Sequence, residues 1–564
     1  MMAMARVMVI AGSSSTSHCL MNRLSKSPAV EACQLAPPCN GSYALLFAEQ
    51  AINTVVYVPQ LQSQHRIIPD LTEAAAVLAE CARTGMTKVV VLSSAAIYGA
   101  TPQNPGLIAE TRSPSRRREN PIAYSWVKLE ALATAHLGQQ TATHLVILRP
   151  AAVLAHGDTH YCSRLFRRRF AVTSPLHDPS LQLLSPEDLA NAVSGAVEHS
   201  GGGIFNVAPD GVIPLRVALR MAGVRRVPVW HSLQRAPRHV LSSFGLVSPM
   251  AQHEYLRYSW TISNQKIKQA SGFVPEWSST EALMDFLPSQ ASERQAGLAR
   301  RLAFDDFGMD TSYIDAWRRR LFTFLHDYYW RIETKGMEHI PRQGRAVLAG
   351  IHRGFMPFDG MMILHQVAQK VGRYVRFLIH PGLTKTPFPF NWWKLGGVNA
   401  CQENVDYVLQ HEELLGYFPE GVQGAFRHYR DAYKLGKLGR DEYVKAALRN
   451  RAPIVPFVTV GSAEIFPIIA KIHWPWWQRI SMWPCIPIAP PFPLLPLPLP
   501  TKWHTQFLEP LHIEHRYPPE AANDAATVRA ISEEVRTRMQ DAIDDMLKRR
   551  KSIFFGSVFE SEAN

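Results

Sequence analysis

A histidine and an aspartate lie close together in the second half of the chain, in the run Gly350–Asp359 (GIHRGFMPFD). The run follows an apolar segment typical of a β-strand, so His352 and Asp359 are expected in a loop at a strand end. A histidine there can act as a general base, because a neighbouring carboxylate fixes its tautomer and orientation. About one such pair is expected by chance among 22 histidines, so the pair needs support from other motifs.

Two further motifs follow in the same half. Tyr417–Gly421 (YFPEG) ends one strand-like segment, and Ala452–Phe457 (APIVPF) enters another. Three motifs in this order at strand ends are difficult to obtain by chance. Basic residues near the second and third motifs, among them Arg430 and Lys434, either bind a phosphate of the substrate or are ordinary solvated side chains.

Together these motifs resemble those of the glycerolipid (lysophospholipid-type) acyltransferases, over about residues 313–555. The resemblance implies that His352 deprotonates an acceptor hydroxyl, which attacks the thioester of acyl-CoA or acyl carrier protein. It implies that Asp359 holds the histidine and that Glu420 and Gly421 form the loop that positions the acceptor. Six residues separate the histidine from the aspartate instead of the usual four, which leaves the identity of the acceptor open.

The first half carries a second set of candidate groups. An apolar run, RVMVIA, leads into Gly12 and Ser13 at the start of a turn of small residues, which can place backbone N–H groups against a pyrophosphate. Tyr124 and Lys128 lie on one face of an expected helix, where the ammonium can stabilise a phenolate. Ser94, in the motif LSSAAIYG, can share a substrate oxygen with the tyrosine.

This half resembles the extended short-chain dehydrogenases of the NAD-dependent epimerase/dehydratase family over roughly residues 6–288. The resemblance implies that Ser94, Tyr124 and Lys128 are catalytic, with Tyr124 exchanging a proton in a hydride-transfer step. The residues that it places at NAD or NADP are Gly12, Ser13, Tyr124 and Lys128.

The chain also departs from that family's pattern. Gly12 is the only glycine of its turn, no acidic residue stands near Gln34 to hold a ribose, and the interval before Thr54–Val58 is short for two β–α units. Two alternatives therefore remain open for the first half. It is either an active reductase or epimerase, which could form the hydroxyl that the second half acylates, or a non-catalytic nucleotide-binding scaffold.

The elements that must position these groups alternate between strands and helices in both halves. Nearly continuous apolar strands between helices indicate a parallel sheet covered on both faces. The expected strands are Arg6–Ala11, Thr54–Val58, Lys88–Leu92, Leu145–Leu148, Ala346–Ile351, Tyr374–Ile379, Leu414–Phe418 and Ile454–Val460, and the expected helices include Leu71–Thr84, Tyr313–Trp330 and one that ends near Lys548–Lys551. The predicted fold class is α/β, with a Rossmann-like N-terminal sheet and a second α/β acyltransferase domain.

The domain boundaries follow from the same pattern. We expect a dinucleotide-binding domain over residues 1–288, a linker over 289–312 that contains the polar run Ser289–Arg301, and an acyltransferase domain over 313–564. A chain of 564 residues is too long for one ordinary core, which agrees with two domains.

Composition narrows the function classes. The formal charge of +13 favours an anionic partner. The basic runs are short and carry no recognisable nucleic-acid-binding motif, which argues against nucleic acid as that partner. Seven scattered cysteines and no His cluster at ligand spacing predict neither disulfides nor a metal site, and they favour a cytoplasmic location. No apolar run is long enough for a membrane-spanning helix, and no oligomeric state is predicted.

The expected partners are therefore the acyl donor, a lipid acceptor and a membrane surface. Most of the 13 tryptophans lie between Trp392 and Trp503, and the segment Pro487–Pro500 alternates proline with apolar residues. Such a ribbon either contacts the headgroup–acyl boundary of a bilayer or wraps the core and is buried. Attraction of basic clusters to anionic lipid favours peripheral attachment on the cytoplasmic face of a membrane.

Overall fold

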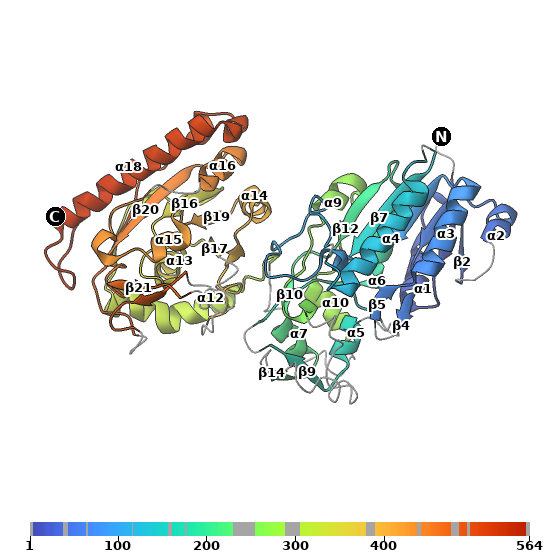
Figure 1. The fold of residues 1–564 in the computed structure, drawn as a ribbon, viewed down its shortest axis with the longest axis horizontal. Coiled ribbons are helices and arrows are strands. Elements are labelled where there is room, and N and C mark those ends of the chain that lie inside the picture. The colour runs from blue at the N-terminus through green and yellow to red at the C-terminus, as the bar shows by residue number, and fades with distance from the viewer. Residues whose placement is uncertain are drawn as a thin grey trace. The chain divides into compact units, whose positions relative to one another are not determined.

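The computed structural model divides into two compact units, Met1–Gly308 and Met309–Asn564, which are considered separately below (Figure 1). The structure describes residues 4–37, 43–63, 66–115, 117–140, 142–155, 161–174, 177–228, 254–287, 305–379, 390–436, 441–474, 484–492 and 497–559. The run Ser289–Arg301, expected as a linker, lies outside the described residues. None of the described helices is both long and apolar enough to cross a bilayer.

A six-stranded parallel sheet forms the centre of the first unit. Its spatial order is β12-β7-β6-β3-β1-β2. The strands are β1 (Ala5–Ile10), β2 (Val30–Ala36), β3 (Thr54–Tyr57), β6 (Lys88–Leu92), β7 (His144–Pro150) and β12 (Gly203–Val207). The chain reverses its direction of progress across the sheet between β1 and β3, and ligands of open α/β sheets bind at the carboxyl ends of strands at such a point.

Helices cover both faces of this sheet. Side chains alternate along each strand, so Met8 and Ile10 of β1 belong to one core and Val7 and Val9 to the other. The first core packs against α3 (Leu71–Thr84) and α4 (Pro121–Leu137), and the second against α1 (Ser15–Leu24), α6 (Pro186–Glu198) and α9 (Gln265–Ser271). The prediction of a Rossmann-like sheet covered on both faces is confirmed.

Smaller elements complete the first unit. Three two-stranded sheets pair β8 (Ala152–Val153) with β11 (Leu183–Leu184), β9 (Phe170–Thr173) with β14 (Arg225–Pro228), and β10 (Ser180–Leu181) with β13 (Ile213–Pro214). A fourth pairs β4 (Leu61–Ser63) with β5 (Arg66–Pro69). Among the described residues the remaining helices are α2 (Tyr43–Glu49), α5 (Tyr161–Phe166), α7 (Leu215–Met221), α10 (Ser279–Phe286) and the 3₁₀ turns η1 (Ala95–Tyr98) and η3 (Glu254–Leu256).

The second unit contains a seven-stranded sheet in the order β15-β23-β20-β16-β19-β17-β18. The strands are β15 (Glu333–Lys335), β16 (Ala346–Gly350), β17 (Val375–Ile379), β18 (Val398–Asn399), β19 (Leu414–Tyr417), β20 (Ile454–Val460) and β23 (His504–Phe507). All neighbours are parallel except β20 and β23. The central strand β16 is buried along its whole length, so the loop that leaves it starts from a fixed position.

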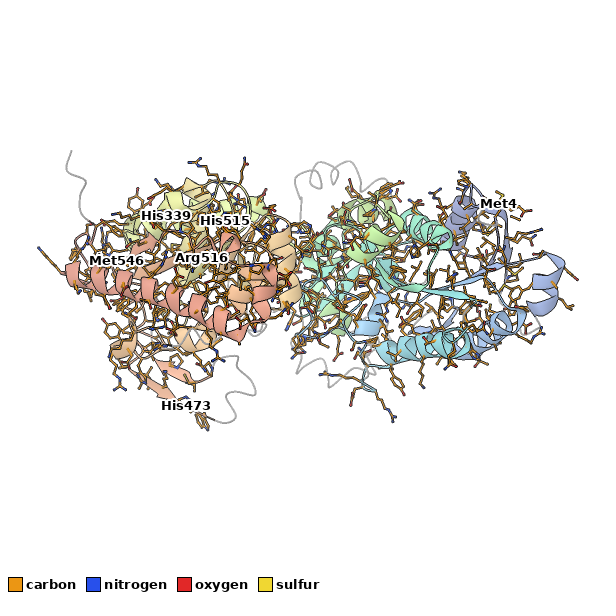
Figure 2. All side chains as sticks on the ribbon, turned by 90° about the horizontal axis from the view of Figure 1, so that it is seen from above. Met4, His339, His473, His515, Arg516 and Met546 are labelled. Atoms are coloured by element: carbon orange, nitrogen blue, oxygen red, sulfur yellow. The ribbon has the colours of Figure 1, made fainter. Side chains whose placement is uncertain are left out.

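Helices surround this second sheet. They are α13 (Phe358–Lys370), α14 (Gln402–Gln410), α15 (Gly421–Ala425), α16 (Glu442–Arg449) and α18 (Ala525–Arg549). The helix predicted over Tyr313–Trp330 begins as α12 (Thr311–Trp317) and continues through the π-helical turns η4 (Arg318–Phe322) and η5 (Phe324–Tyr329). The helix expected to end near Lys548–Lys551 is α18, and its buried side chains include Met546 (Figure 2).

The described tryptophans between Trp392 and Trp503 divide between the core and the surface. Trp392 is 9% exposed and Trp503 is fully buried, because both belong to the core of the second unit. Trp474 is about half exposed, and Trp476 and Trp477 lie outside the described residues. Residues Ile486–Ile488 of the proline-rich segment form β22, which pairs with β21 (Ala470–Ile472), whereas Leu497 is exposed.

Candidate active site

The structure brings His352 and Asp359 together at the end of β16. His352 Nδ1 lies 2.7 and 2.9 Å from the two carboxylate oxygens of Asp359, and the backbone N–H groups of Arg353 and Gly360 donate to the same carboxylate at 2.9 and 2.8 Å. The carboxylate is 1% exposed, whereas the imidazole is 17% exposed. Because Nδ1 donates to Asp359, Nε2 is the nitrogen that can accept a proton.

The loop between the two residues accommodates the six-residue spacing through its backbone. Gly354 has φ +76° and Phe355 has φ +35°, and a side chain on Gly354 would approach the Ser462 carbonyl oxygen. The turn leads directly into α13, so Asp359 lies in the first turn of a helix, where the helix dipole stabilises a negative charge.

A cavity of about 550 Å³ adjoins the dyad. His352 lines it together with Glu420, Gly421 and Arg427. Its other lining side chains are mainly aliphatic and aromatic, and they include Phe355, Met361, Leu364, Phe377, Trp392, Leu395, Phe418 and Phe426. The Phe418 ring lies 5.1 Å from the imidazole, measured between ring centroids. A cavity of this kind suits a long apolar group whose reactive end reaches the histidine.

Glu420 binds side chains of the protein itself. Its carboxylate forms ion pairs with Arg353 at 2.6 Å and with Arg427 at 2.5 Å, and the Gly436 N–H donates to it at 3.2 Å. Arg353 also donates to the His352 carbonyl oxygen at 2.9 Å. Burial lowers the pKa of Arg353, and Glu420 opposes that shift. Glu420 therefore connects the second motif to the backbone of the histidine, and contact with an acceptor stays a prediction.

The other predicted groups of this half are not gathered at the cavity. The side chains of Arg430 and Lys434 are 83% and 78% exposed, form ion pairs with Asp431, and are not among the lining residues. Their role in substrate binding stays a prediction. The motif Ala452–Phe457 enters β20, and Phe457 packs in the core beside β16.

Arg353 was not singled out from the sequence, although it follows His352 directly. It is 1% exposed, and only the fold shows that its partner is Glu420.

In the first unit, Gly12 and Ser13 link β1 to α1 at the point where the sheet order reverses. Ser14 caps α1 by accepting from the Ser17 N–H, and a side chain on Gly12 would meet only Gln60, at 3.7 Å. A turn of this kind before a helix can place backbone N–H groups against a pyrophosphate, and contact of Gly12 and Ser13 with a cofactor stays a prediction. No acidic residue follows β2, so the ribose of a dinucleotide lacks the carboxylate that usually holds it.

Ser94, Tyr124 and Lys128 lie on two elements that pack together, η1 and α4. The Lys128 ammonium lies 4.8 Å from the centre of the Tyr124 ring, so the predicted pair is formed. Ser94 caps η1, since its hydroxyl accepts from the Ala96 N–H at 3.2 Å. The catalytic roles of the three residues stay predictions.

The first unit also contains a buried polar network that was not predicted from the sequence. Arg149 forms a two-pronged ion pair with Glu130 at 2.9 and 2.7 Å and donates to the Tyr98 hydroxyl at 2.7 Å. Tyr98 donates to Asn206, and Ser93 donates to Glu130. Several residues of the motifs that carry the dehydrogenase resemblance thus support β6, β7 and β12 from within.

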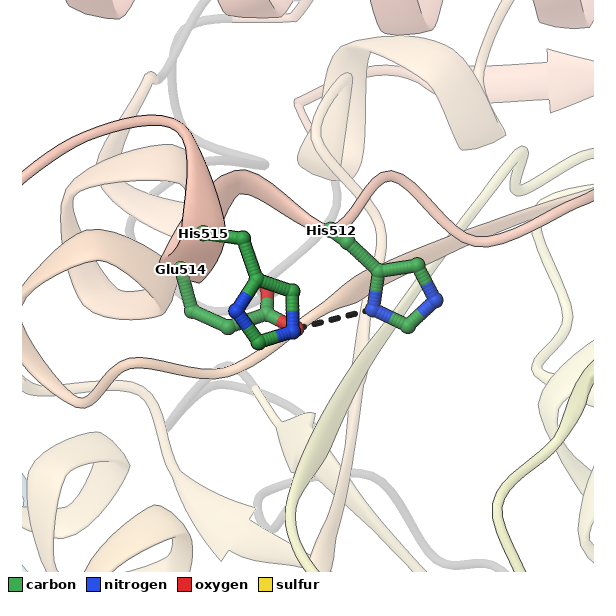
Figure 3. A group of neighbouring side chains, drawn as sticks. All are labelled: His512, Glu514 and His515. Carbon is green, nitrogen blue, oxygen red and sulfur yellow. Dashed lines mark hydrogen bonds and ion pairs between the residues drawn. The ribbon is translucent and has the colours of Figure 1, made fainter.

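A histidine cluster on the second unit was also not predicted from the sequence. His512 and His515 flank Glu514 on the surface of the second unit, with His512 Nδ1 2.8 Å and His515 Nε2 3.5 Å from the same carboxylate oxygen (Figure 3). Both imidazoles are more than half exposed, and two histidine–carboxylate contacts account for the arrangement.

Comparison with known proteins supports an epimerase/dehydratase domain in the first half of the chain. Residues 62–208 match the model of the NAD dependent epimerase/dehydratase family, a span that contains Ser94, Tyr124 and Lys128 but not Gly12. A solved structure, MoeE5 in complex with UDP-glucuronic acid and NAD, aligns with 52% of this chain and 100% of its own, at 16% identity and a TM-score of 0.39.

Two curated proteins extend the comparison. The uncharacterized protein Rv0502 of Mycobacterium tuberculosis (strain ATCC 25618 / H37Rv) is 34% identical over 290 residues, which are 50% of this chain and 80% of that protein. Phytyl ester synthase 2, chloroplastic, of Arabidopsis thaliana is 28% identical over 143 residues, 24% of this chain and 20% of that protein. The chain therefore carries an NAD-dependent epimerase/dehydratase domain and belongs to the same family as the mycobacterial protein Rv0502.

Proposed function

We propose that the second unit is an acyltransferase that moves a fatty acyl group from acyl-CoA or acyl carrier protein to the hydroxyl of a glycerolipid such as a lysophospholipid. The observation that carries the proposal is the His352–Asp359 dyad on the wall of a large apolar cavity. The partial similarity to phytyl ester synthase 2 supports ester formation as the reaction class.

In the proposed reaction each group has a step. His352 Nε2 accepts the proton of the acceptor hydroxyl while Nδ1 donates to Asp359, which stabilises the imidazolium. The hydroxyl oxygen attacks the thioester carbonyl, the new C–O bond forms, and the C–S bond breaks. The imidazolium then returns its proton to the departing thiolate, so the products are an ester and a free thiol.

Thiol release tests this proposal directly. Purified protein is mixed with a long-chain acyl-CoA and lysophosphatidic acid, and free thiol is followed with a chromogenic reagent. His352→Ala is expected to lower the rate by about 10²–10⁴-fold, because the general base is lost. His515→Ala, at an exposed histidine, serves as the matched control. Equal rates in His352→Ala and the wild type would overturn the assignment of the base.

For the first unit we propose binding of NAD or NADP at the turn after β1. The position of Gly12 between β1 and the N-terminus of α1 and the match to the epimerase/dehydratase family support it. When bound, the nicotinamide would supply the hydride acceptor or donor, and Tyr124 and Lys128 would exchange the accompanying proton with the substrate. The test is equilibrium titration with NADH and NADPH. No binding at millimolar concentration would leave this unit as a scaffold, and deletion of it would then leave acyl transfer intact.

A further inference from the structure

Several segments of the second unit expose large apolar side chains, and three of them are joined to one another. Phe324 and Tyr328 on η5 are 50% and 71% exposed, Leu497 is 63% exposed, and Phe555 in the C-terminal segment is 72% exposed. Such side chains are usually buried, and when they gather on one surface they mark an interaction site.

Hydrogen bonds join the three segments into one surface. Arg331 donates to the carbonyl oxygens of Tyr329, Pro500 and Phe554 at 2.9–3.0 Å, and its guanidinium lies 6.0 Å from the centre of the Phe555 ring. The Tyr329 hydroxyl donates to the Pro498 carbonyl oxygen at 2.6 Å. Figure 1 shows the red C-terminal segment returning from α18 toward the yellow-green helix that contains η5. We call Phe324, Tyr328, Leu497, Phe554 and Phe555 the aromatic surface.

The helix that contains η5 buries one side and exposes the other. Phe322 and Leu325 of the same helix are buried in the core, while the rings of Phe324 and Tyr328 stack on each other with centroids 6.4 Å apart. The exposed rings therefore belong to a helix that is anchored in the core by its buried side.

Unpaired cations flank the aromatic surface. Arg319 and Arg320 precede Phe324 on the helix, and Lys548 and Lys551 precede the C-terminal segment; all four are exposed, and no ion pair is recorded for them within the described ranges. Asp327, the acidic residue on the same turn, is held by His326 at 2.6 Å. Cations beside exposed aromatic rings match a bilayer with anionic headgroups, where rings enter the headgroup boundary and cations contact phosphates.

We propose that the aromatic surface is a docking site for an anionic phospholipid bilayer. The site also connects to the dyad, because the Trp330 ring, one residue beyond η5, lies 5.3 Å from the ring of Phe358, which precedes Asp359. Docking therefore holds the acyl-chain cavity at the bilayer. The inference concerns binding and does not depend on acyl transfer, so it can be measured separately from catalysis.

Vesicle flotation of the full chain tests the proposal. We expect the protein to float with vesicles of phosphatidylcholine and phosphatidylglycerol, and far less with phosphatidylcholine alone. Phe324→Ser combined with Phe555→Ser should lower the partition coefficient at least about tenfold. Phe170→Ser and Val274→Ser, at positions 41% and 72% exposed in the first unit, are matched controls and should bind as the wild type does.

Two further measurements complete the test. Lys548→Gln with Lys551→Gln should lower binding to anionic vesicles about 30-fold at low salt, at about 1 kcal/mol per charge, and added salt should remove the difference. His352→Ala should bind vesicles normally, so loss of activity and loss of docking are distinguishable. Three results would each overturn the proposal. The first is equal flotation of the aromatic variant and the wild type, and the second is no flotation of the wild type. The third is dimerisation through this surface, measured by light scattering.

Discussion

Glu420 offers the sharpest test of how the second unit is held together. Its side chain is 3% exposed and lies between Arg353, which is 1% exposed, and Arg427, which is 25% exposed. Glu420→Gln keeps the size of the side chain but removes its charge. The Arg353 guanidinium is then a buried cation without a counter-ion.

The expected cost follows from burial. Removing one partner of a buried ion pair destabilises a protein by about 3–5 kcal/mol, because the remaining charge has no access to water. At about 2–4 °C per kcal/mol for a unit of this size, the melting temperature of the second unit should fall by about 6–20 °C. Most of the 13 tryptophans lie in this unit, so tryptophan fluorescence during heating or urea titration reports its unfolding.

The control is Glu534, which also lies between two arginines. It pairs with Arg516 at 2.8 Å and Arg538 at 2.7 Å, but all three side chains are about 30–45% exposed. Glu534→Gln should therefore cost less than about 1 kcal/mol. A loss of stability in Glu420→Gln no greater than in Glu534→Gln would refute the argument from burial. Replacing Arg353 and Glu420 together by methionine should recover most of the loss.

Three other predictions concern the dyad, a buried histidine and a strand glycine. Asp359→Asn should lower the thiol-release rate by about 10²–10⁴-fold, because the imidazole loses the partner that fixes its tautomer. Burial lowers the pKa of His365 from 6.5 to about 4, so the unfolded chain binds a proton that the folded one does not, and the free energy of unfolding should fall as pH decreases from 6.5 to 4. His365→Leu should flatten that dependence in urea titrations. Gly350→Ala should cost about 1–3 kcal/mol in the same titrations, because its methyl group would overlap the Phe457 ring.

Specific outcomes would contradict these three predictions. A rate for Asp359→Asn within threefold of the wild type would mean that the carboxylate does not orient His352. His515→Leu, at an exposed histidine, should leave the pH dependence unchanged, so an equal effect of both substitutions would show that His365 is not its source. In Gly12→Ala the added methyl group meets only the flexible Gln60 side chain. If this substitution lowered the free energy of unfolding as much as Gly350→Ala does, overlap with the Phe457 ring would not be the cause.

Elements with strong local patterns were predictable from the sequence. The expected strands Lys88–Leu92 and Ile454–Val460 and the helix Leu71–Thr84 agree with β6, β20 and α3 because each is an apolar or periodic run between turn residues. The His352–Asp359 pair was predictable for the same local reason, since both residues belong to one short loop.

Features that depend on distant residues were not predictable. From the sequence alone Arg353 resembles a surface residue. Only the fold places Glu420, which follows another strand, beside it. The π-helical turns η4 and η5 could not be predicted, because an apolar period near 3.6 residues predicts a helix but does not distinguish an α-helical turn from a wider π-helical one. The sequence left open whether the aromatic residues of this half face a membrane or the core, and the structure places Trp392 and Trp503 in the core, since composition does not distinguish an exposed aromatic residue from a buried one.

The central position of β16 has a consequence for how the site loses activity when the second unit unfolds. This strand is bonded on both sides, to β19 and β20, and every one of its residues is buried. Its amide hydrogens should therefore exchange with solvent only when the whole second unit opens. Because the dyad begins at the end of this strand, gradual denaturation should abolish activity together with the fold of the unit and not before it.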